Sequence, residues 1–339
     1  MRNRPIVIPL LGAAAAGAGV LAWRWYQQRD RIVVGTGYGA EVLRTPESRF
    51  DGLKDYAFAP RYVEVDGLRV HHVEEGPEQG QVVLLLHGEP SWSYLYRKMI
   101  PLLAAAGHRA IAPDLIGFGK SDKLADTDAY TYQRHVDWMW SWLQSLDLND
   151  VTLVCQDWGA LIGLRLVAEH PERFSRVVVA NGALPTGDQE MPRAFKRWLA
   201  FSQRVPTLPI GRIMQMGTVT ELAQETLDAY TAPFPNEDYK AGARVFAALV
   251  PITPDDPAAP ANRKAWEALE KFEKPFLTAF GDSDPITQGA DRVFQERVPG
   301  AQGQAHTIIE GAGHFIQEDK GEELAQVVLD FTAANAVAG

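Results

Sequence analysis

The stretch from Val151 to Gly163 contains Asp157, the residue with the clearest potential for chemistry. An apolar, β-branched run precedes Asp157 and an apolar helical pattern follows it, so a strand turns sharply into a helix at this point. That layout is typical of a nucleophile elbow, where the motif Gly-x-Ser-x-Gly presents a reactive serine. Here Cys155 replaces the first glycine, Asp157 replaces the serine and Gly159 keeps the last glycine. The candidate nucleophile is therefore a carboxylate.

A carboxylate nucleophile favours one class of reaction because of the product that it forms. A serine that displaced a leaving group from saturated carbon would form an ether, which histidine and water cannot hydrolyse. An aspartate would form an ester, which they can hydrolyse. Asp157 therefore fits substrates that are attacked at sp3 carbon, such as alkyl halides or epoxides. The alternative is that Asp157 only caps the N-terminus of the following helix.

Two later residues complete a possible catalytic triad. Asp284, within Gly281–Pro285, follows a predicted strand, and His314, within Gly311–Phe315, follows the last one. Nucleophile, acid and histidine in this order, each after a strand, is the order of the α/β-hydrolase fold. Each residue could instead be structural, since an aspartate can cap a turn and a histidine can simply be packed. Asp282 is the alternative acid.

The loop His87–Pro90 directly follows a predicted strand and predicts part of an oxyanion hole. In this fold one backbone N–H comes from that loop and the other from the residue after the nucleophile. We expect the backbone N–H groups of Glu89 and Trp158 to be these donors. They would stabilise the oxyanion that forms when water attacks the Asp157 ester, and loss of one such donor typically costs about 10²–10³ in rate.

The elements that must position these groups alternate between strand and helix, which predicts a mostly parallel sheet covered by helices. The alternation stops between about residues 184 and 268, which we interpret as an inserted helical cap. The predicted strands are 61–65, 68–74, 82–86, 109–113, 151–154, 176–180, 275–280 and 306–309, and the first two form a hairpin around Asp66-Gly67. The predicted helices are 92–106, 132–146, 160–169, 290–298 and 315–333.

The predicted organisation is one α/β-hydrolase core in two parts, residues 41–183 and 269–339, with the cap at 184–268. Residues 1–40 form an N-terminal signal or anchor segment and a glycine-rich linker. Arginines flank an apolar run over residues 6–23, a pattern that resembles a signal peptide or a short membrane anchor. We therefore expect an exported or membrane-anchored protein, with a cytoplasmic location as the alternative.

Composition excludes several classes of partner. The chain has 339 residues and a formal charge of −10, which argues against nucleic acid or an anionic membrane surface binding the folded body. Cys155 is the single cysteine, so an internal disulfide is excluded, and no zinc-ligand spacing is present. We expect a monomer that acts on a small molecule without a metal or an organic cofactor.

Several stretches of the chain resemble haloalkane dehalogenases. The resemblance covers about Leu43 to the C-terminus and is closest to the branch with Glu after His-Gly. It implies hydrolysis of a haloalkane to a primary alcohol, a halide ion and a proton, through an ester on Asp157 that water attacks with help from His314 and Asp284. The stretches that carry it are residues 44–50, 87–101, 114–123, 156–159, 230–235 and 313–318.

In that family two indole N–H groups hold the departing halide, and an indole carries one donor and no acceptor. Trp158 matches the Trp after the nucleophile. Trp198 matches the second donor, which the cap supplies in the branch with Glu, although Trp198 could also be ordinary packing. Trp266 is the alternative second donor. The apolar wall of the pocket is predicted to include Phe195, Phe201, Met214 and Met216, although such residues more often belong to a core.

Three other functions remain open on the sequence. An epoxide hydrolase uses the same Asp nucleophile but needs acid donors in the cap, for which Tyr230 and Tyr239 are available. A serine esterase is opposed by the lack of any Gly-x-Ser-x-Gly motif. A ligand-binding receptor could be built on the same body, although a complete catalytic triad opposes it.

Overall fold

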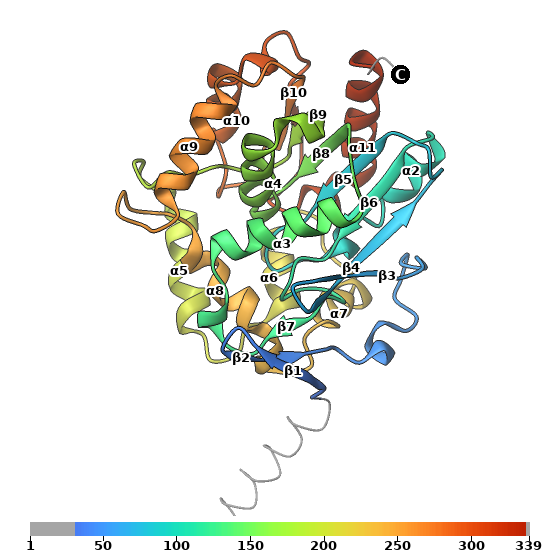
Figure 1. Ribbon diagram of the computed structural model, residues 1–339, viewed down its shortest axis with the longest axis vertical. Coiled ribbons are helices and arrows are strands. Elements are labelled where there is room, and N and C mark those ends of the chain that lie inside the picture. The colour runs from blue at the N-terminus through green and yellow to red at the C-terminus, as the bar shows by residue number, and fades with distance from the viewer. Residues whose placement is uncertain (1–30, 337–339) are drawn as a thin grey trace, which may run out of the picture.

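An eight-stranded sheet runs through the centre of the molecule, and the computed structural model describes residues 31–336 around it (Figure 1). The strands are β3 (Arg61–Val65), β4 (Leu68–Glu75), β5 (Val82–Leu86), β6 (Arg109–Pro113), β8 (Val151–Cys155), β9 (Phe174–Val179), β10 (Phe276–Gly281) and β11 (Thr307–Ile309). Their order across the sheet is β11-β10-β9-β8-β5-β6-β4-β3. Only the pairs β3–β4 and β4–β6 are antiparallel. The sheet is therefore mostly parallel, as predicted.

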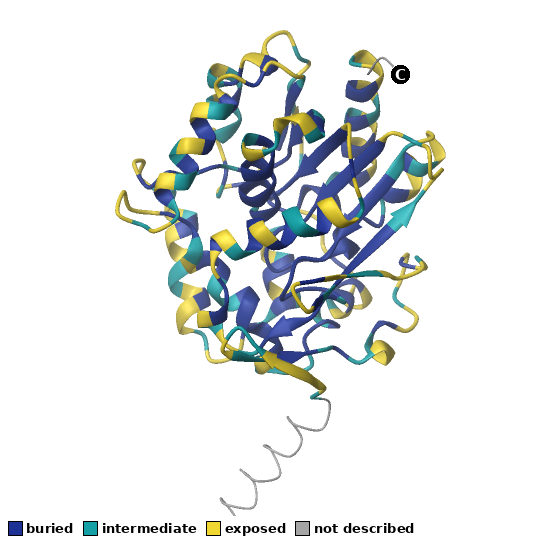
Figure 2. Ribbon diagram, in the orientation of Figure 1, coloured by how far each residue is buried: buried dark blue, intermediate teal, exposed yellow. Residues whose placement is uncertain are grey.

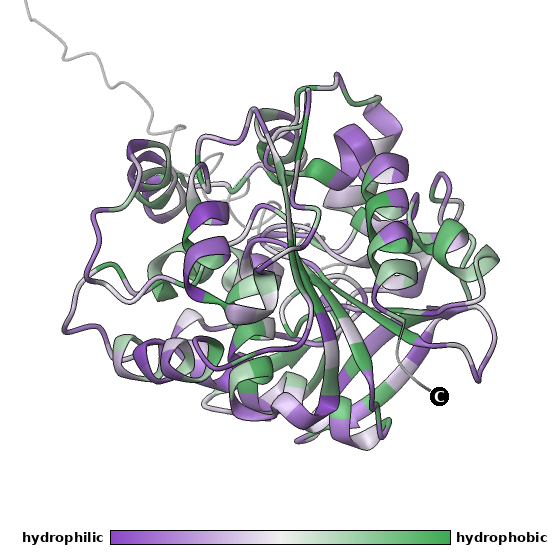
Figure 3. Ribbon diagram, turned by 90° about the horizontal axis from the view of Figure 1, so that it is seen from above, coloured by the Kyte–Doolittle hydropathy of each residue, from purple (hydrophilic) through white to green (hydrophobic). Residues whose placement is uncertain are grey.

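Helices lie on both faces of this sheet (Figures 1 and 3). On one face α4 packs against α3 and α9, and on the other α11 packs against α2. These helices are α2 (Ile100–Ala105), α3 (Tyr132–Ser145), α4 (Trp158–Glu169), α9 (Ala259–Leu269), α10 (Ala290–Arg297) and α11 (Ile316–Ala334). Because both faces are covered, the inner strands carry continuous apolar runs rather than an alternating pattern.

The core is centred on the inner strands. Every residue of β5 and β8 is buried, and so are all but one residue of β9. Figure 2 shows these strands buried inside a partly exposed layer of helices, and Figure 3 shows long hydrophobic stretches along them. The carboxyl ends of these parallel strands therefore form a rigid edge, from which the loops of a site can project.

The segment between β9 and β10 is helical. It contains α5 (Arg193–Arg204), α6 (Ile210–Met216), α7 (Gln224–Thr231) and α8 (Ala241–Leu249) before α9, and none of its residues, all of which are described, belongs to a strand. Helix α9 packs against the core helix α4. The last helix of this segment is therefore part of the layer that covers the sheet.

The predicted linker at residues 35–39 is wrong. Strands β1 (Val33–Gly37) and β2 (Ala40–Leu43) form a hairpin and join β7 (Lys123–Leu124) in a second, antiparallel sheet. Tyr38 and Gly39 have φ values of 54° and 78°, which suit the two central positions of a type I′ turn. The Tyr38 ring packs edge-on against Trp138 at 5.7 Å. The glycines that suggested a flexible segment thus belong to a tight turn and its strand.

The predicted helix over residues 92–106 is also wrong in part. The chain forms a 3₁₀ turn over Ser93–Tyr96 before α2 begins. The Ser93 N–H donates to Asp114 Oδ1 at 2.7 Å, and the Trp92 indole donates to Ala229 O at 3.2 Å. These tertiary hydrogen bonds hold the first turn in a tighter geometry than the helical pattern indicates.

Of the predicted N-terminal segment 1–40, the signal or anchor part lies outside the described residues except for Arg31, and the linker part lies in the hairpin. Within residues 31–336, no helix is both long enough and apolar enough to cross a membrane.

A buried ion pair connects the sheet side of the molecule with the inserted helices. Arg97 and Glu318 are 4% and 1% exposed, and Arg97 Nη2 donates to Glu318 Oε2 at 2.9 Å. The Tyr230 hydroxyl of α7 donates to Glu318 Oε1, which Arg97 Nη1 also contacts. Removing one member leaves a buried charge without its partner, which is strongly unfavourable.

We therefore predict that Arg97→Met lowers the free energy of unfolding by about 3–5 kcal/mol, measured by urea denaturation. The control is Lys54→Met, since Lys54 is exposed and lies 3.9 Å from the exposed Glu225 carboxylate. An exposed pair of this kind contributes little to stability. If Arg97→Met and Lys54→Met had equal free energies of unfolding, the buried Arg97–Glu318 pair would not have the stabilising role described above.

Candidate active site

Asp157 lies at a strained turn between β8 and α4. Its φ and ψ are 51° and −123°, a combination that costs free energy in a non-glycine residue and is characteristic of functional sites. Gly159 makes the turn possible, since a Cβ there would lie 2.0 Å from Leu86 O. Gly88 likewise allows the neighbouring loop to approach, since its Cβ would lie 2.2 Å from Asp157 Oδ1. The local sequence thus presents the carboxylate at the edge of the sheet.

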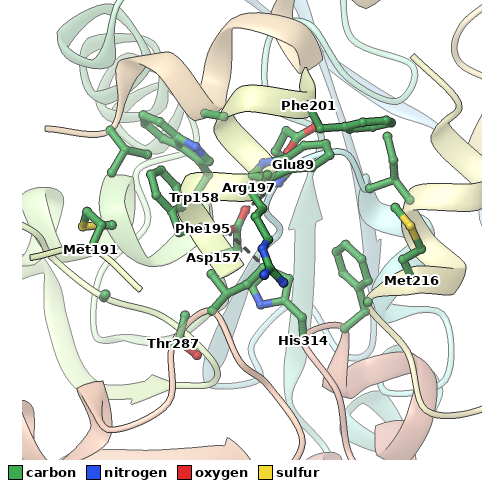
Figure 4. A pocket seen from close by; sticks show the side chains of 18 of the residues that line it. Glu89, Asp157, Trp158, Met191, Phe195, Arg197, Phe201, Met216, Thr287 and His314 are labelled. Atoms are coloured by element: carbon green, nitrogen blue, oxygen red, sulfur yellow. Dashed lines mark hydrogen bonds and ion pairs between the residues drawn. The ribbon is translucent and has the colours of Figure 1, made fainter. Parts of the chain in front are cut away.

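His314 lies between two carboxylates. Its Nε2 is 3.5 Å from Asp157 Oδ2 (Figure 4), and its Nδ1 is 3.0 Å from Asp284 Oδ2. Asp284 is buried, and its other oxygen accepts the Ile286 N–H at 2.9 Å. The structure therefore brings together Asp157, His314 and Asp284, three residues that the sequence proposes as a triad.

The alternative acid, Asp282, is exposed and has a different position. Its Oδ1 accepts the Gly311 N–H at 2.9 Å and the Ser283 hydroxyl at 2.8 Å. Asp282 therefore joins the loop that carries Asp284 to the loop that carries His314, and among the described residues its side chain makes no hydrogen bond to the imidazole.

The two carboxylates control the protonation of the histidine. Burial lowers the pKa of His314, but the charge of Asp284 and the hydrogen bond and charge of Asp157 raise that pKa further, to about 10. Burial raises the pKa of Asp284, but its charge interaction and hydrogen bond with His314 lower that pKa below its usual value. In the free protein at neutral pH, an imidazolium therefore lies between two carboxylates.

One of the two predicted oxyanion donors contacts the Asp157 carboxylate, and the other is the residue that follows Asp157 in the chain. The backbone N–H of Glu89 donates to Asp157 Oδ1 at 2.8 Å. Trp158 is the first residue of α4, where backbone N–H groups have no partner inside the helix. Because Oδ1 is held by Glu89, Oδ2 is the oxygen left to react.

The carboxylate and the imidazole open into a cavity of about 540 Å³ that is mainly apolar. Trp158 and Trp198 both line it, from α4 and α5. Met214 is fully buried in the core, so its prediction as a lining residue is wrong. Other lining residues include Glu89, Met191, Phe195, Arg197, Phe201, Arg212, Ile213, Met216 and Thr287 (Figure 4).

The alternative halide donor, Trp266, lies elsewhere. Its indole N–H donates to Leu184 O at 2.8 Å, and its ring stacks on Phe294 at 5.3 Å. Trp266 borders a smaller cavity of about 300 Å³ instead. The structure thus places Trp198, and not Trp266, in the wall of the cavity that contains the carboxylate.

The two tyrosines that an epoxide hydrolase would need are also directed elsewhere. Tyr230 donates its hydroxyl to Glu318 Oε1. The Tyr239 hydroxyl accepts the Ile32 N–H at 2.8 Å. Neither tyrosine lines the cavity that contains Asp157. The acid donors of that alternative are therefore not in reach of the candidate nucleophile.

Asn181 is a site residue that the sequence reasoning missed. Its carbonyl accepts the Asp157 N–H at 3.0 Å, its Nδ2 donates to Gly313 O at 2.7 Å, and its Oδ1 accepts the Gly281 N–H at 2.8 Å. The Asn181 side chain thus joins the end of β10 to the loop after β11, and its backbone carbonyl joins them to the turn after β8. A signal existed, since Asn181 follows a buried strand just as the triad residues do.

Within residues 31–336, no cluster of three or more His, Cys, Asp or Glu side chains is arranged to hold a metal ion.

Comparison with known proteins places this arrangement in a family. A model of the alpha/beta hydrolase fold matches residues 81–321. The chain is 58% identical to a haloalkane dehalogenase from Psychrobacter cryohalolentis, over 87% of this chain and 99% of that protein. This chain belongs to the haloalkane dehalogenase family. It is also 55% identical to haloalkane dehalogenase 1 of Mycobacterium tuberculosis, with coverage of 87% and 99%.

The haloalkane dehalogenase fold extends over almost the whole described chain. The structure of a tetrameric haloalkane dehalogenase from Paraglaciecola agarilytica NO2 matches with a TM-score of 0.81 and 34% identity, over 88% of this chain and 99% of that one. The predictions of family and of fold class are confirmed.

We predict that Asp157→Asn lowers the pKa of His314, because the variant removes a carboxylate charge and the hydrogen bond that it makes to the imidazolium. NMR titration of the imidazole measures the shift. His135 is an internal control, since burial lowers its pKa to about 3 and it should stay neutral at neutral pH in both proteins. An unchanged His314 titration would show that Asp157 does not stabilise the imidazolium.

Proposed function

We propose that this haloalkane dehalogenase hydrolyses a haloalkane to a primary alcohol, a halide ion and a proton through a covalent ester on Asp157. Asp157 is the nucleophile, His314 the base and Asp284 its orienting acid. The observation that supports these roles best is the position of the His314 imidazole, 3.5 Å and 3.0 Å from the two carboxylates at the wall of an apolar cavity.

In the first step Asp157 Oδ2 attacks the carbon in line with the leaving halide. The Glu89 N–H holds the other oxygen at 2.8 Å, which fixes the orientation of the carboxylate. The C–O bond forms as the C–halogen bond breaks, and the electron pair leaves with the halide. The indole N–H groups of Trp158 and Trp198 stabilise that developing charge, which is effective in a cavity with few polar groups.

In the second step the ester is hydrolysed. Alkylation neutralises Asp157, so the hydrogen bond and the charge by which it raises the pKa of His314 are lost. The pKa of His314 falls, although Asp284 still raises it, and the imidazolium releases its proton to the solvent as the proton product of the reaction. Neutral His314 removes a proton from water, whose oxygen attacks the Asp157 carbonyl carbon. The N–H groups of Glu89 and Trp158 hold the oxyanion until the alcohol leaves. Asp284 stays ionised and stabilises the imidazolium.

The wider organisation of the protein remains a proposal. We infer that the helices within residues 184–268 cap the site between the core parts 41–183 and 269–339, because α5 and α6 supply much of the cavity wall. A monomer is still our expectation, although the relative from Paraglaciecola agarilytica is tetrameric. Export or anchoring through residues 1–30 is likewise a prediction.

We predict that His314→Phe accumulates the ester, because alkylation needs only Asp157 whereas hydrolysis needs the imidazole. Mass spectrometry after incubation with 1,2-dibromoethane should find the alkyl group on the peptide that contains Asp157. The control, His314→Phe with Asp157→Asn, should stay unmodified. If His314→Phe carries no alkyl group on Asp157 while wild type releases bromide, the proposed mechanism is wrong.

We predict that Trp198→Phe weakens bromide binding by about 10- to 100-fold, the effect of losing one hydrogen bond to a charged group. Quenching of tryptophan fluorescence by bromide gives the dissociation constant. The matched control is Trp266→Phe, which removes the hydrogen bond to Leu184 O outside this cavity and should lower stability only. If both variants lost the same bromide affinity, the Trp198 indole would not be a specific donor to the halide.

A further inference from the structure

Glu89 is a second carboxyl group in the cavity, and the mechanism above uses only its backbone. The residue is 5% exposed, and its Oε1 atom is buried without a hydrogen-bond partner among the described residues. Trp198 lines the same cavity, and its proximity slightly opposes the rise in the pKa of the Glu89 carboxyl group. Glu89 and Asp157 line the same pocket (Figure 4). The side chain therefore shares the cavity with the nucleophile and a proposed halide donor, and one of its oxygens has no hydrogen-bond partner among the described residues.

Two carboxyl groups in one apolar cavity cannot both be ionised at low cost. The Asp157 side chain has two neighbouring donors, the Glu89 N–H at 2.8 Å from Oδ1 and His314 Nε2 at 3.5 Å from Oδ2, and such donors favour a carboxylate. Burial and the charge of Asp157 raise the pKa of Glu89 well above its ordinary value. The proton of the pair therefore resides on Glu89.

A protonated carboxyl group has an O–H donor that a carboxylate lacks. A carboxylate next to Trp198 would repel a halide, whereas an O–H would attract one. We propose that the Glu89 side chain is a neutral carboxylic acid and the third hydrogen-bond donor to the departing halide, beside Trp158 and Trp198. This inference rests on the proposed function, because it takes the halide site next to the two indoles as given.

Other charged groups around the cavity do not replace Glu89 in this role. Asp157 is an acceptor only, and His314 is directed at two carboxylates. Arg197 and Arg212 line the cavity but are exposed, so water screens their charges. Glu89 is thus the one lining residue that is buried, adjacent to Trp198 and able to donate from an unpartnered oxygen.

The test compares bromide dissociation constants of the full chain, measured by tryptophan fluorescence quenching, in wild type, Glu89→Gln and Glu89→Leu. Glutamine keeps a donor without a charge, so Glu89→Gln should bind within about threefold of wild type. Leucine has no donor, so Glu89→Leu should bind about tenfold more weakly or worse, as expected for a lost hydrogen bond to a charged group. Circular dichroism and thermal unfolding check that both variants fold.

Three results would overturn the proposal. If both variants bind bromide more tightly, Glu89 is an ionised carboxylate that repels the halide. If both bind more weakly to the same extent, its role is structural. If Glu89→Leu binds as tightly as wild type, the side chain does not touch the halide.

A measurement on wild type supports the test in case Glu89→Leu does not fold. The infrared spectrum at neutral pH should contain a carbonyl band of a protonated carboxyl group that shifts when bromide is added and that is absent from Glu89→Gln. A spectrum without such a band overturns the proposal. The ester trapped in His314→Phe is an independent readout, so the proposed function stands if the ester forms and only this inference fails.

Discussion

The site depends on a positive imidazolium held between two carboxylates where little water reaches. Burial alone would keep His314 neutral, and the two aspartates reverse that preference. The pKa of His314 depends on the charge of Asp157, because that charge stabilises the imidazolium. Neutralising Asp157 therefore lowers the pKa of the ring that faces it. In the proposed mechanism, alkylation of Asp157 would thus lower the pKa of His314 and favour its neutral, basic form.

That arrangement requires three loops from different strands to meet within hydrogen-bonding distance. The parallel strands β8, β10 and β11 all end at the same edge of the sheet, which brings the loops close. Asn181 then fixes their relative positions with hydrogen bonds to each loop. The strained backbone at Asp157 is tolerated because the glycines around it leave room and the buried strands beneath it are rigid.

The sequence was sufficient for features that depend on local pattern. Apolar runs located the strands, and their carboxyl ends located Asp157, Asp284 and His314. The sequence could not settle alternatives that depend on contacts between residues far apart in the chain. The choice of Asp284 over Asp282, of Trp198 over Trp266, and the exclusion of Met214 from the cavity each depend on which way a side chain faces in the folded chain. Asn181 was missed because a single amide after a strand has no motif around it.

The hairpin of β1 and β2 illustrates the same limit in another form. Glycine spacing predicted a linker, but Tyr38 packs on Trp138 and β2 pairs with β7, so distant residues convert a flexible pattern into an ordered one. Local propensity is a weak guide wherever packing partners are far away along the chain.

The buried cluster of Arg97, Glu318 and Tyr230 has a mechanical consequence. Glu318 lies in the first turn of α11, four residues after His314, and it accepts a hydrogen bond from the Tyr230 hydroxyl of α7. The loop that carries His314 and helix α7 of the inserted segment are therefore both attached to Glu318. A substitution that breaks this cluster would therefore disturb the position of α7 and the orientation of the His314 imidazole together.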